Sequence, residues 1–351
     1  GINDHLFGGF FRYASDRKWS MPHFEKMLSD NVQIISFLMG MYEKTGNKLY
    51  SYSAQKAMDF ILYGDMRSDF GYLESLDADS LNAGGSYEEG YFYRVTDRDF
   101  SVLNENELRN FPNEAGIDNG VIRLKHSEYI KFAALEPTLK KAADRIRAVK
   151  SHPQPDNKAL SGTNFMLCSA LLKCYEAMSE DYYLEQALSL FHKIRNILVS
   201  GGIVYRGLYV SEAEINGNLG KNEDAAAVFK DFIINHRTLS DHVYYLEAAL
   251  KFYEIYNAQE FLHIAESVAA EIEKTFVKDG IPYLDINRRV CDTFDDDKPN
   301  PAGLYLYLTV KYSDKLNIKP DDRFIKFAID RAARFPTGHP TIIRALELAG
   351  K

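Results

Sequence analysis

The sequence predicts an all-α fold in which helical hairpins form a closed toroid, with short β-hairpins at one end. Apolar residues recur at helical spacing through most of the 351 residues. A unit of long helix, short break and long helix also recurs, which is typical of a solenoid or a toroid. Connections within the hairpins are short and those between hairpins are long, and this asymmetry favours the toroid.

The first predicted hairpin follows Trp19. An apolar stripe that includes Phe24, Leu28 and Ile35 predicts a helix over residues 22–44, with Ser20 as its N-cap. Thr45-Gly46-Asn47 breaks this helix, and a second one is expected over residues 48–66.

Later segments repeat the pattern. Helix pairs are predicted at 164–178 with 182–199, 242–256 with 261–276, and 302–312 with 322–335, and a last helix at 341–348. Weaker helical patterns cover 105–110, 139–149 and 224–235. Glycine beside aromatic or β-branched residues predicts short extended segments at 70–73, 202–205 and 280–283, and a strand at 91–95.

Composition excludes several classes of partner. The net charge is −8 and no basic face is evident, so we expect no nucleic acid partner and no membrane partner. The three cysteines, Cys168, Cys174 and Cys291, have no zinc-ligand spacing and cannot all pair, which suits buried thiols in a reducing cytoplasm. We expect neither a metal site nor a cofactor.

Four polar clusters lie at or just before the first helix of a hairpin, and a fifth lies in the excursion that follows the second helix of a hairpin. In alternating helices these positions fall at the same end as the long loops, so five distant segments are expected to surround one mouth. The clusters are Trp19 with His23, Glu25, Lys26 and Asp30; Asp77 with Asp79, Glu88 and Glu89; Asp156 with Lys158 and Asn164; Asp241 with His242; and Asp295–Asp297 with Lys298.

His23 is the first candidate for catalysis. In the predicted helix, His23, Lys26 and Asp30 share one face, and His23 lies in the first turn, where the helix dipole disfavours the imidazolium. A neutral histidine there could act as a base or bind a hydroxyl. The alternative is a histidine that only satisfies a loop carbonyl at the helix end, and it is favoured for His23 taken alone.

Two other groups permit two interpretations each. Asp77 and Asp79 could form a carboxylate pair for glycoside chemistry or hold a cation, although capping of their own turn is favoured. The aromatic residues near Tyr13, Trp19 and Tyr93 could form the walls of a sugar site or pack in the core. Trp19, beside polar neighbours, is the strongest candidate for a ligand contact.

At these residues the chain resembles the spermatogenesis-associated protein 20 family. The resemblance rests on a long and specific N-terminal pattern, made by residues 1–6, 8–13, Asp16, Trp19, residues 22–28, Asp30 and Asn31. Shorter matches occur at residues 75–80 and 89–93, at Asp156, Lys158, Leu160, Asn164 and Met166, and at Leu239, Asp241, His242 and Leu246.

The resemblance implies an (α/α)6 barrel related to six-hairpin glycosidases and to N-acylglucosamine 2-epimerase, preceded in the family by a thioredoxin-like domain. Residues 1–351 would then be a single barrel domain, truncated at its N-terminus. The thioredoxin-like domain and the first of the barrel's six hairpins would lie before Gly1, so the hairpin that follows Trp19 would be a later one of the barrel. The chain departs from the family pattern at Thr163, Phe165, Leu304 and Tyr305, which erodes two of the clusters.

The resemblance implies a cavity that binds or converts a carbohydrate-like small molecule, by epimerase- or glycosidase-like chemistry if the protein is an enzyme. The epimerase relatives use paired histidines as acid and base. The alternatives are a recognition module for a thioredoxin-like quality-control protein and a scaffold without catalysis. The expected catalytic groups are His23, Asp79, Asp241 and His242. Substrate contacts are expected from Arg12, Tyr13, Trp19, Glu25, Lys26, Asp30, Asp77, Tyr93, Asp156, Lys158 and Asn164.

Overall fold

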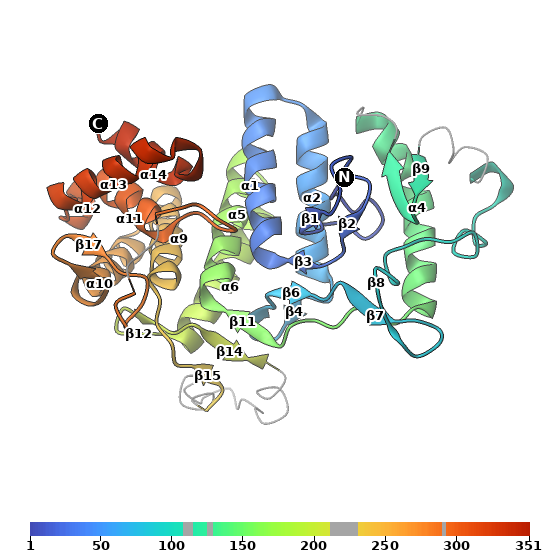
Figure 1. Ribbon diagram of the computed structural model, residues 1–351, viewed down its shortest axis with the longest axis horizontal. Helices are drawn as coiled ribbons and strands as arrows, with labels where there is room; N and C mark the ends of the chain where they lie inside the picture. Colours follow the sequence, from blue (N-terminus) through green and yellow to red (C-terminus); the bar gives the residue numbers. More distant parts are fainter. Residues whose placement is uncertain (108–114, 125–128, 211–230, 290–292) are drawn as a thin grey trace. The chain divides into compact units, whose positions relative to one another are not determined.

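The computed structural model describes residues 1–107, 115–124, 129–210, 231–289 and 293–351 (Figure 1). The chain divides into two compact units. The N-terminal unit comprises residues 1–68 and 72–157, and the C-terminal unit comprises residues 69–71 and 158–351. The expectation of one barrel domain without a thioredoxin-like domain stays a prediction. None of the helices in the described residues has the length and apolar character needed to span a bilayer.

The N-terminal unit contains the first helical hairpin. Helix α1 (Leu28–Thr45) packs against α2 (Lys48–Tyr63), and the long helix α4 (Tyr129–Val149) lies later in the unit (Figure 1). Gly46 ends α1 in a left-handed conformation, and the Asn47 side chain caps α2 by accepting a hydrogen bond from the Leu49 amide. The predicted break at residues 45–47 and the second helix are confirmed.

The start of α1 differs from the prediction by six residues. Pro22–His23 forms strand β2, which pairs with β1 (Tyr13–Ala14), and Lys26–Met27 forms β3, which pairs with β6 (Ser75–Leu76). The Leu28 amide then bonds the Glu74 carbonyl. Non-local pairing therefore overrides the helical pattern of residues 22–27. Ser20 is not an N-cap, and His23, Lys26 and Asp30 do not share a helix face.

Asn31 joins α1 to the N-terminal loop. Its Oδ1 accepts a hydrogen bond from the Phe10 amide at 2.7 Å, and its Nδ2 donates to the carbonyls of Phe10 and Met27 at 3.1 and 2.8 Å. Asn31 is fully buried, so these bonds satisfy polar groups that water does not reach.

The expected strand at 91–95 is wrong. These residues form turns, because the Tyr91 amide bonds the Glu88 carbonyl and the Arg94 amide bonds the Gly90 carbonyl. The neighbouring extended pairs are β7 (Asp79–Leu81) with β8 (Tyr87–Glu89), and β9 (Ala115–Asp118) with β10 (Val121–Leu124). Residues 105–107 are helical as expected, and the rest of that segment lies outside the described residues.

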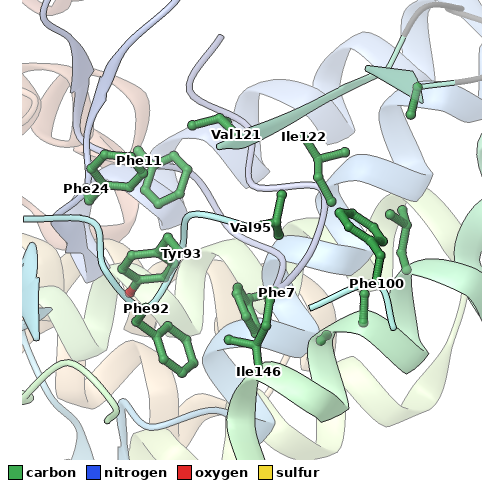
Figure 2. Packing of buried hydrophobic residues seen from close by; sticks show 14 of the residues in the cluster. Phe7, Phe11, Phe24, Phe92, Tyr93, Val95, Phe100, Val121, Ile122 and Ile146 are labelled. Carbon is green, nitrogen blue, oxygen red and sulfur yellow. The ribbon is translucent and has the colours of Figure 1, made fainter. Parts of the chain in front are cut away.

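An aromatic cluster forms the core of the N-terminal unit (Figure 2). Phe92 stacks on Phe7 with ring centroids 4.6 Å apart, and Phe11 meets Phe24 and Tyr93 edge to face at 5.2 Å. Such pairs add roughly 0.5–1.5 kcal/mol each beyond the burial of their area. The cluster joins the N-terminal loop, the turns at 91–95 and helix α4.

The C-terminal unit repeats the hairpin pattern. Helix α5 (Ser161–Met178) packs against α6 (Asp181–Leu198) and against α9 (Leu239–Tyr256), which in turn packs against α10 (Gln259–Phe276). Residues 161–172 of α5 are buried without a break, whereas α6 buries a single stripe. First helices of successive hairpins are thus enclosed and second helices are amphipathic. This arrangement agrees with the predicted all-α helical-hairpin fold.

The remaining elements of this unit are the helices α11 (Pro301–Lys311), α12 (Ser313–Leu316), α13 (Asp322–Arg334) and α14 (Pro340–Leu348), the 3-10 turn η1 (Pro336–Gly338), and the strand pairs β12 (Val199–Ser200) with β13 (Ile203–Val204) and β16 (Val277–Lys278) with β17 (Ile281–Pro282). The predicted helices at 302–312, 322–335 and 341–348 and the extended segments at 202–205 and 280–283 are present among them, whereas α12, η1 and β12 were not predicted. The expected extended segment at 70–73 contains β5 (Gly71–Tyr72), which follows β4 (Arg67–Ser68).

One helix prediction fails in this unit. A three-stranded sheet has the order β11 (Lys158–Leu160), β14 (Gly207–Tyr209), β15 (Ile233–Ile234). Strand β15 occupies the end of the segment 224–235 for which a helix was predicted, because Ile233 and Ile234 pair with β14. Residues 224–230 and Cys291 lie outside the described residues.

Candidate functional site

His23 lies in a group of ionisable side chains on the N-terminal unit. Its Nδ1 is 2.8 Å from Oε1 of Glu89, and its Nε2 is 3.7 Å from Oε2 of Glu25. The Arg12 guanidinium donates to the same Glu25 oxygen at 2.8 Å, and the Tyr13 ring stacks on the imidazole at 4.9 Å. We call these five residues the His23 cluster.

Strand pairing positions the cluster. In the β1–β2 pair Tyr13 is opposite His23, and in the β7–β8 pair Asp79 is opposite Glu89. Directly opposed residues of a pair lie close together, so the second carboxylate, Asp79, is brought next to the glutamate that bonds His23. The sequence therefore named four of the five cluster members as site residues, and it named Glu89 only as part of an acidic segment.

Carboxylates accept hydrogen bonds, so Nδ1 of His23 must carry the proton shared with Glu89. In the neutral ring, Nε2 is then the acceptor. The His23 side chain is 27% exposed, which leaves the ring within reach of a small molecule. This arrangement is that of a carboxylate-oriented histidine that can accept a proton or a hydroxyl hydrogen bond.

Trp19 is exposed beside this segment rather than enclosed in a pocket. Its side chain is 56% exposed, and its backbone is left-handed with φ of 56°. The Asp16 carboxylate holds the turn by accepting bonds from the amides of Lys18, Ser20 and Met21. The Met21 amide is the largest of the causes that lower the pKa of Asp16 to about 2.

Lys26 points into the core, away from the His23 cluster. Its Nζ is fully buried, donates to Oδ2 of Asp4 at 2.6 Å and to the Gly8 carbonyl at 2.7 Å, and lies over the rings of Phe11, Phe60 and Tyr93 at 4.3–4.9 Å. Burial lowers the pKa of Lys26, and the Asp4 carboxylate opposes this shift. A substrate contact by Lys26 stays a prediction, and its burial favours a structural role.

Tyr93 is also buried, within the aromatic cluster (Figure 2). Burial raises the pKa of its phenol. Among the described residues its hydroxyl has no hydrogen-bond partner. Asp77 has a local function, since its Oδ1 accepts a bond from the Asp79 amide, as the turn interpretation expects.

The remaining predicted contacts are distributed over both units. Asp30 lies in the first turn of α1, and the Asp156 amide bonds the Ser75 carbonyl in the N-terminal unit. In the C-terminal unit Lys158 pairs with Tyr209, and the fully buried Asn164 donates to the Leu160 carbonyl at 2.8 Å. The convergence of all these residues on one mouth stays a prediction.

Asp241 and His242 are fully buried at the start of α9. Asp241 bonds the Arg206 guanidinium at 2.8 Å and the Thr238 hydroxyl at 2.5 Å. His242 donates from Nδ1 to the Thr238 carbonyl and accepts from the Val204 amide at Nε2. Burial lowers the pKa of His242. Both ring nitrogens are occupied, so the geometry favours a structural role, and a catalytic role stays a prediction.

The acidic loop at Asp295–Asp297 begins with a structural carboxylate. Asp295 accepts hydrogen bonds from the Asn300 amide at 2.5 Å and from the Thr341 amide at 2.7 Å. It thereby ties this loop to the first turn of α14. Within the described ranges, no three His, Cys, Asp or Glu side chains lie together in an arrangement suited to a metal ion.

The structure also shows a cavity that the sequence did not indicate. It has a volume of about 400 Å³ and lies in the N-terminal unit between the loop at residues 3–8, helix α2 and helix α4. None of the predicted site residues is among those that line it. Its polar side chains include Lys56, Asp59 and Glu136. Asp4 also lines it, and Asp4 belongs to the N-terminal pattern from which the resemblance was recognised.

Comparisons with known proteins give relatives by sequence and by structure. No protein-family model matches the chain. Spermatogenesis-associated protein 20 of Homo sapiens is 34% identical over 104 residues, 29% of this chain and 13% of that protein. An uncharacterised protein of Caenorhabditis elegans is 23% identical over 319 residues, 78% of this chain and 40% of that protein. The matches thus span less than half of these relatives' length.

Among the solved structures that resemble the fold are two cellobiose 2-epimerases. The cellobiose 2-epimerase of Bacillus thermoamylovorans has a TM-score of 0.53 at 12% identity, over 95% of this chain and 66% of its own. That of Spirochaeta thermophila has a TM-score of 0.52 at 12% identity, over 94% and 66%. At this identity the likeness concerns the fold alone. The chain is therefore a relative of spermatogenesis-associated protein 20 with the all-α helical-hairpin fold that these epimerases share.

Proposed function

We propose that the chain binds a carbohydrate-like small molecule at the His23 cluster. The observation that carries the proposal is the His23–Glu89 pair, with 2.8 Å between Nδ1 and Oε1, on a partly exposed ring. Bonding through Nδ1 leaves Nε2 to accept a hydroxyl proton. The two cellobiose 2-epimerases that share the fold support a sugar as the ligand class.

The neighbours of His23 suit such a ligand. The Tyr13 ring is half-exposed and offers an apolar face for sugar C–H groups. Arg12 and Glu25 supply a donor and an acceptor at one side of the imidazole. A site with a few convergent polar groups beside an aromatic wall is the usual composition for small-molecule recognition. If conversion follows binding, His23 is the group that moves the proton. A cytoplasmic location belongs to the same proposal.

The test is calorimetry with cellobiose, D-glucose and N-acetylglucosamine on the parent chain and on His23→Gln. We expect His23→Gln to weaken binding at least tenfold while leaving the free energy of unfolding nearly unchanged. His152→Gln is the matched control, because His152 also bonds a carboxylate, Asp65, at 2.9 Å but stands outside the cluster. Equal binding by His23→Gln and the parent, or no binding of any of these sugars by the parent, would refute the proposal.

A second candidate is a binding protein without turnover. The observation that favours it is the engagement of Asp241 and His242 in internal bonds, which leaves neither ring nitrogen of His242 for a substrate. Nuclear magnetic resonance of a bound sugar incubated with the chain distinguishes the two candidates. New epimer or hydrolysis signals indicate conversion, and an unchanged spectrum with retained affinity indicates binding only.

A further inference from the structure

The cavity in the N-terminal unit has the size and walls of a small-molecule site. Its volume of about 400 Å³ lies within the range of roughly 300–1,000 Å³ typical of ligand pockets. The loop at residues 3–8 covers one side, and the facing surfaces of α2 and α4 form the others. The His23 cluster shares no residue with the cavity lining.

Aromatic rings supply the apolar part of the lining. Phe7 and Phe60 are buried members of the core that reach the cavity, and Tyr52 and Tyr63 come from α2. Tyr63 is 65% exposed, so its ring presents a face to anything that enters. The Arg147 guanidinium lies over the Phe7 ring at 5.2 Å and is 3.5 Å from an oxygen of Asp144, and it brings N–H donors to one wall.

Most charges of the lining are balanced by partners. Asp4 is paired with Lys26 behind the wall, Lys56 forms a close ion pair with Glu136, and Lys140 bonds Asp144 at 2.6 Å. The Tyr52 hydroxyl reaches Glu136 at 3.5 Å. Because both signs are present and largely compensated, the cavity does not select strongly for a net charge on its ligand.

Asp59 differs from the other acids. Within the part of the chain that the structure describes, its carboxylate makes no hydrogen bond and no ion pair, although it lines the cavity beside Lys56. Asp59 is exposed at the cavity, so its carboxylate is open to accept hydroxyl or amine hydrogens supplied by a ligand.

We propose that this cavity is a second binding site, for a neutral polyhydroxylated molecule of one or two sugar rings. Asp59 would accept hydroxyl hydrogen bonds, Lys56 and Arg147 would donate to ring or hydroxyl oxygens, and Tyr63 would pack against C–H groups. This combination of an acceptor, cationic donors and aromatic faces matches the alternating polar and apolar surface of a polyol. The inference does not depend on the His23 cluster.

The test combines calorimetry and hydrogen exchange on the full chain, with D-glucose and cellobiose as probes. Because the His23 cluster is proposed to bind the same sugars, both substitutions are made in the His23→Gln chain. There we expect Asp59→Asn to weaken the remaining binding at least tenfold, and Ser53→Phe, which fills the cavity from α2, to remove it. Asp330→Asn is the control, since Asp330 pairs with Arg334 on α13 in the other unit. In the His23→Gln chain, sugar should still protect the amides of residues 52–64 from exchange.

Three results would overturn the inference. The first is sugar binding by the His23→Gln chain that neither Asp59→Asn nor Ser53→Phe changes. The second is protection confined to residues 13–25 and lost in His23→Gln, which would place all binding at the His23 cluster. The third is binding of propylammonium chloride that Asp59→Asn removes, with no binding of either sugar, which would make the cavity a site for organic cations. Retained urea midpoints would show that the variants fold.

Discussion

Replacing Lys26 by Met should destabilise the protein strongly, because Lys26 forms a buried ion pair. Its Nζ lies 2.6 Å from Oδ2 of Asp4, and both side chains are almost fully buried. At an effective dielectric constant of about 20, unit charges at this distance attract by about 6 kcal/mol. The cost of removing two ions from water offsets much of that attraction, so the net value of the intact pair is small.

In the variant, the free-energy cost of burying the Asp4 carboxylate remains, and its attraction to the Lys26 ammonium is lost. In Lys26→Met the Asp4 carboxylate stays buried, and of the residues that the structure describes, only Leu6 and Phe7 donate to it, through their amides at 2.9 and 3.1 Å. Removing one partner of such a pair typically costs about 3–5 kcal/mol. The contacts of the ammonium with three aromatic rings add roughly 0.5–2 kcal/mol each to what is lost.

Urea unfolding of four chains measures this effect: the parent, Lys26→Met, Asp4→Leu and the double variant. We expect Lys26→Met to lower the free energy of unfolding by at least about 3 kcal/mol. The double variant should lose less than the sum of the two single losses, because it leaves no buried charge unpaired. A loss below about 1 kcal/mol in Lys26→Met, or additive losses in the double variant, would refute the reasoning.

Three further predictions concern reactivity, pH and backbone conformation. Both thiols of α5 are buried and burial raises their pKa values, so they should react with Ellman's reagent only after unfolding; rapid reaction of the folded chain would contradict this. Burial lowers the pKa of His5 to about 4, so between about pH 4 and 6.5 the unfolded state binds more protons than the folded state. The free energy of unfolding should therefore fall by up to about 3 kcal/mol as the pH is lowered from about 6.5 to about 4. Urea titrations across this pH range check this, and His5→Gln should make the free energy of unfolding less dependent on pH. Gly90 has φ of 73° and an added Cβ would lie 2.5 Å from the Phe24 ring, so Gly90→Ala should cost about 1–3 kcal/mol, and more than Gly85→Ala, which has φ of 80° but open space; equal losses of thermal stability would disprove the steric argument.

Helical periodicity predicted most of the architecture. In the C-terminal unit the starts and ends of α5, α6, α9 and α10 lie within three residues of the predicted ones. These helices bury continuous or periodic apolar surfaces, which local sequence encodes directly. The start of α1 was missed because residues 26–27 pair with residues 75–76, and such distant pairing leaves no local pattern in the sequence.

The candidate sites were less predictable for the same reason. His23 and Glu89 are 66 positions apart, and Lys56 and Glu136 are 80 positions apart. The resemblance identified the segments expected to carry the site residues, but it did not show which side chains turn inward. Lys26 stands in the same short segment as His23, yet strand alternation directs one into the core and the other toward solvent.

Asn31 has a consequence for chemical ageing and for sequence variation. The side-chain amide of Asn31 bonds both the N–H and the C=O of Phe10, as a residue of a paired β-strand would. Deamidation would turn the donating nitrogen into an oxygen facing two carbonyls, and repulsion would replace attraction at both. Aspartate, nearly identical in shape, is therefore among the least tolerable replacements, whereas the helical setting shields the amide from the backbone attack that starts this decay.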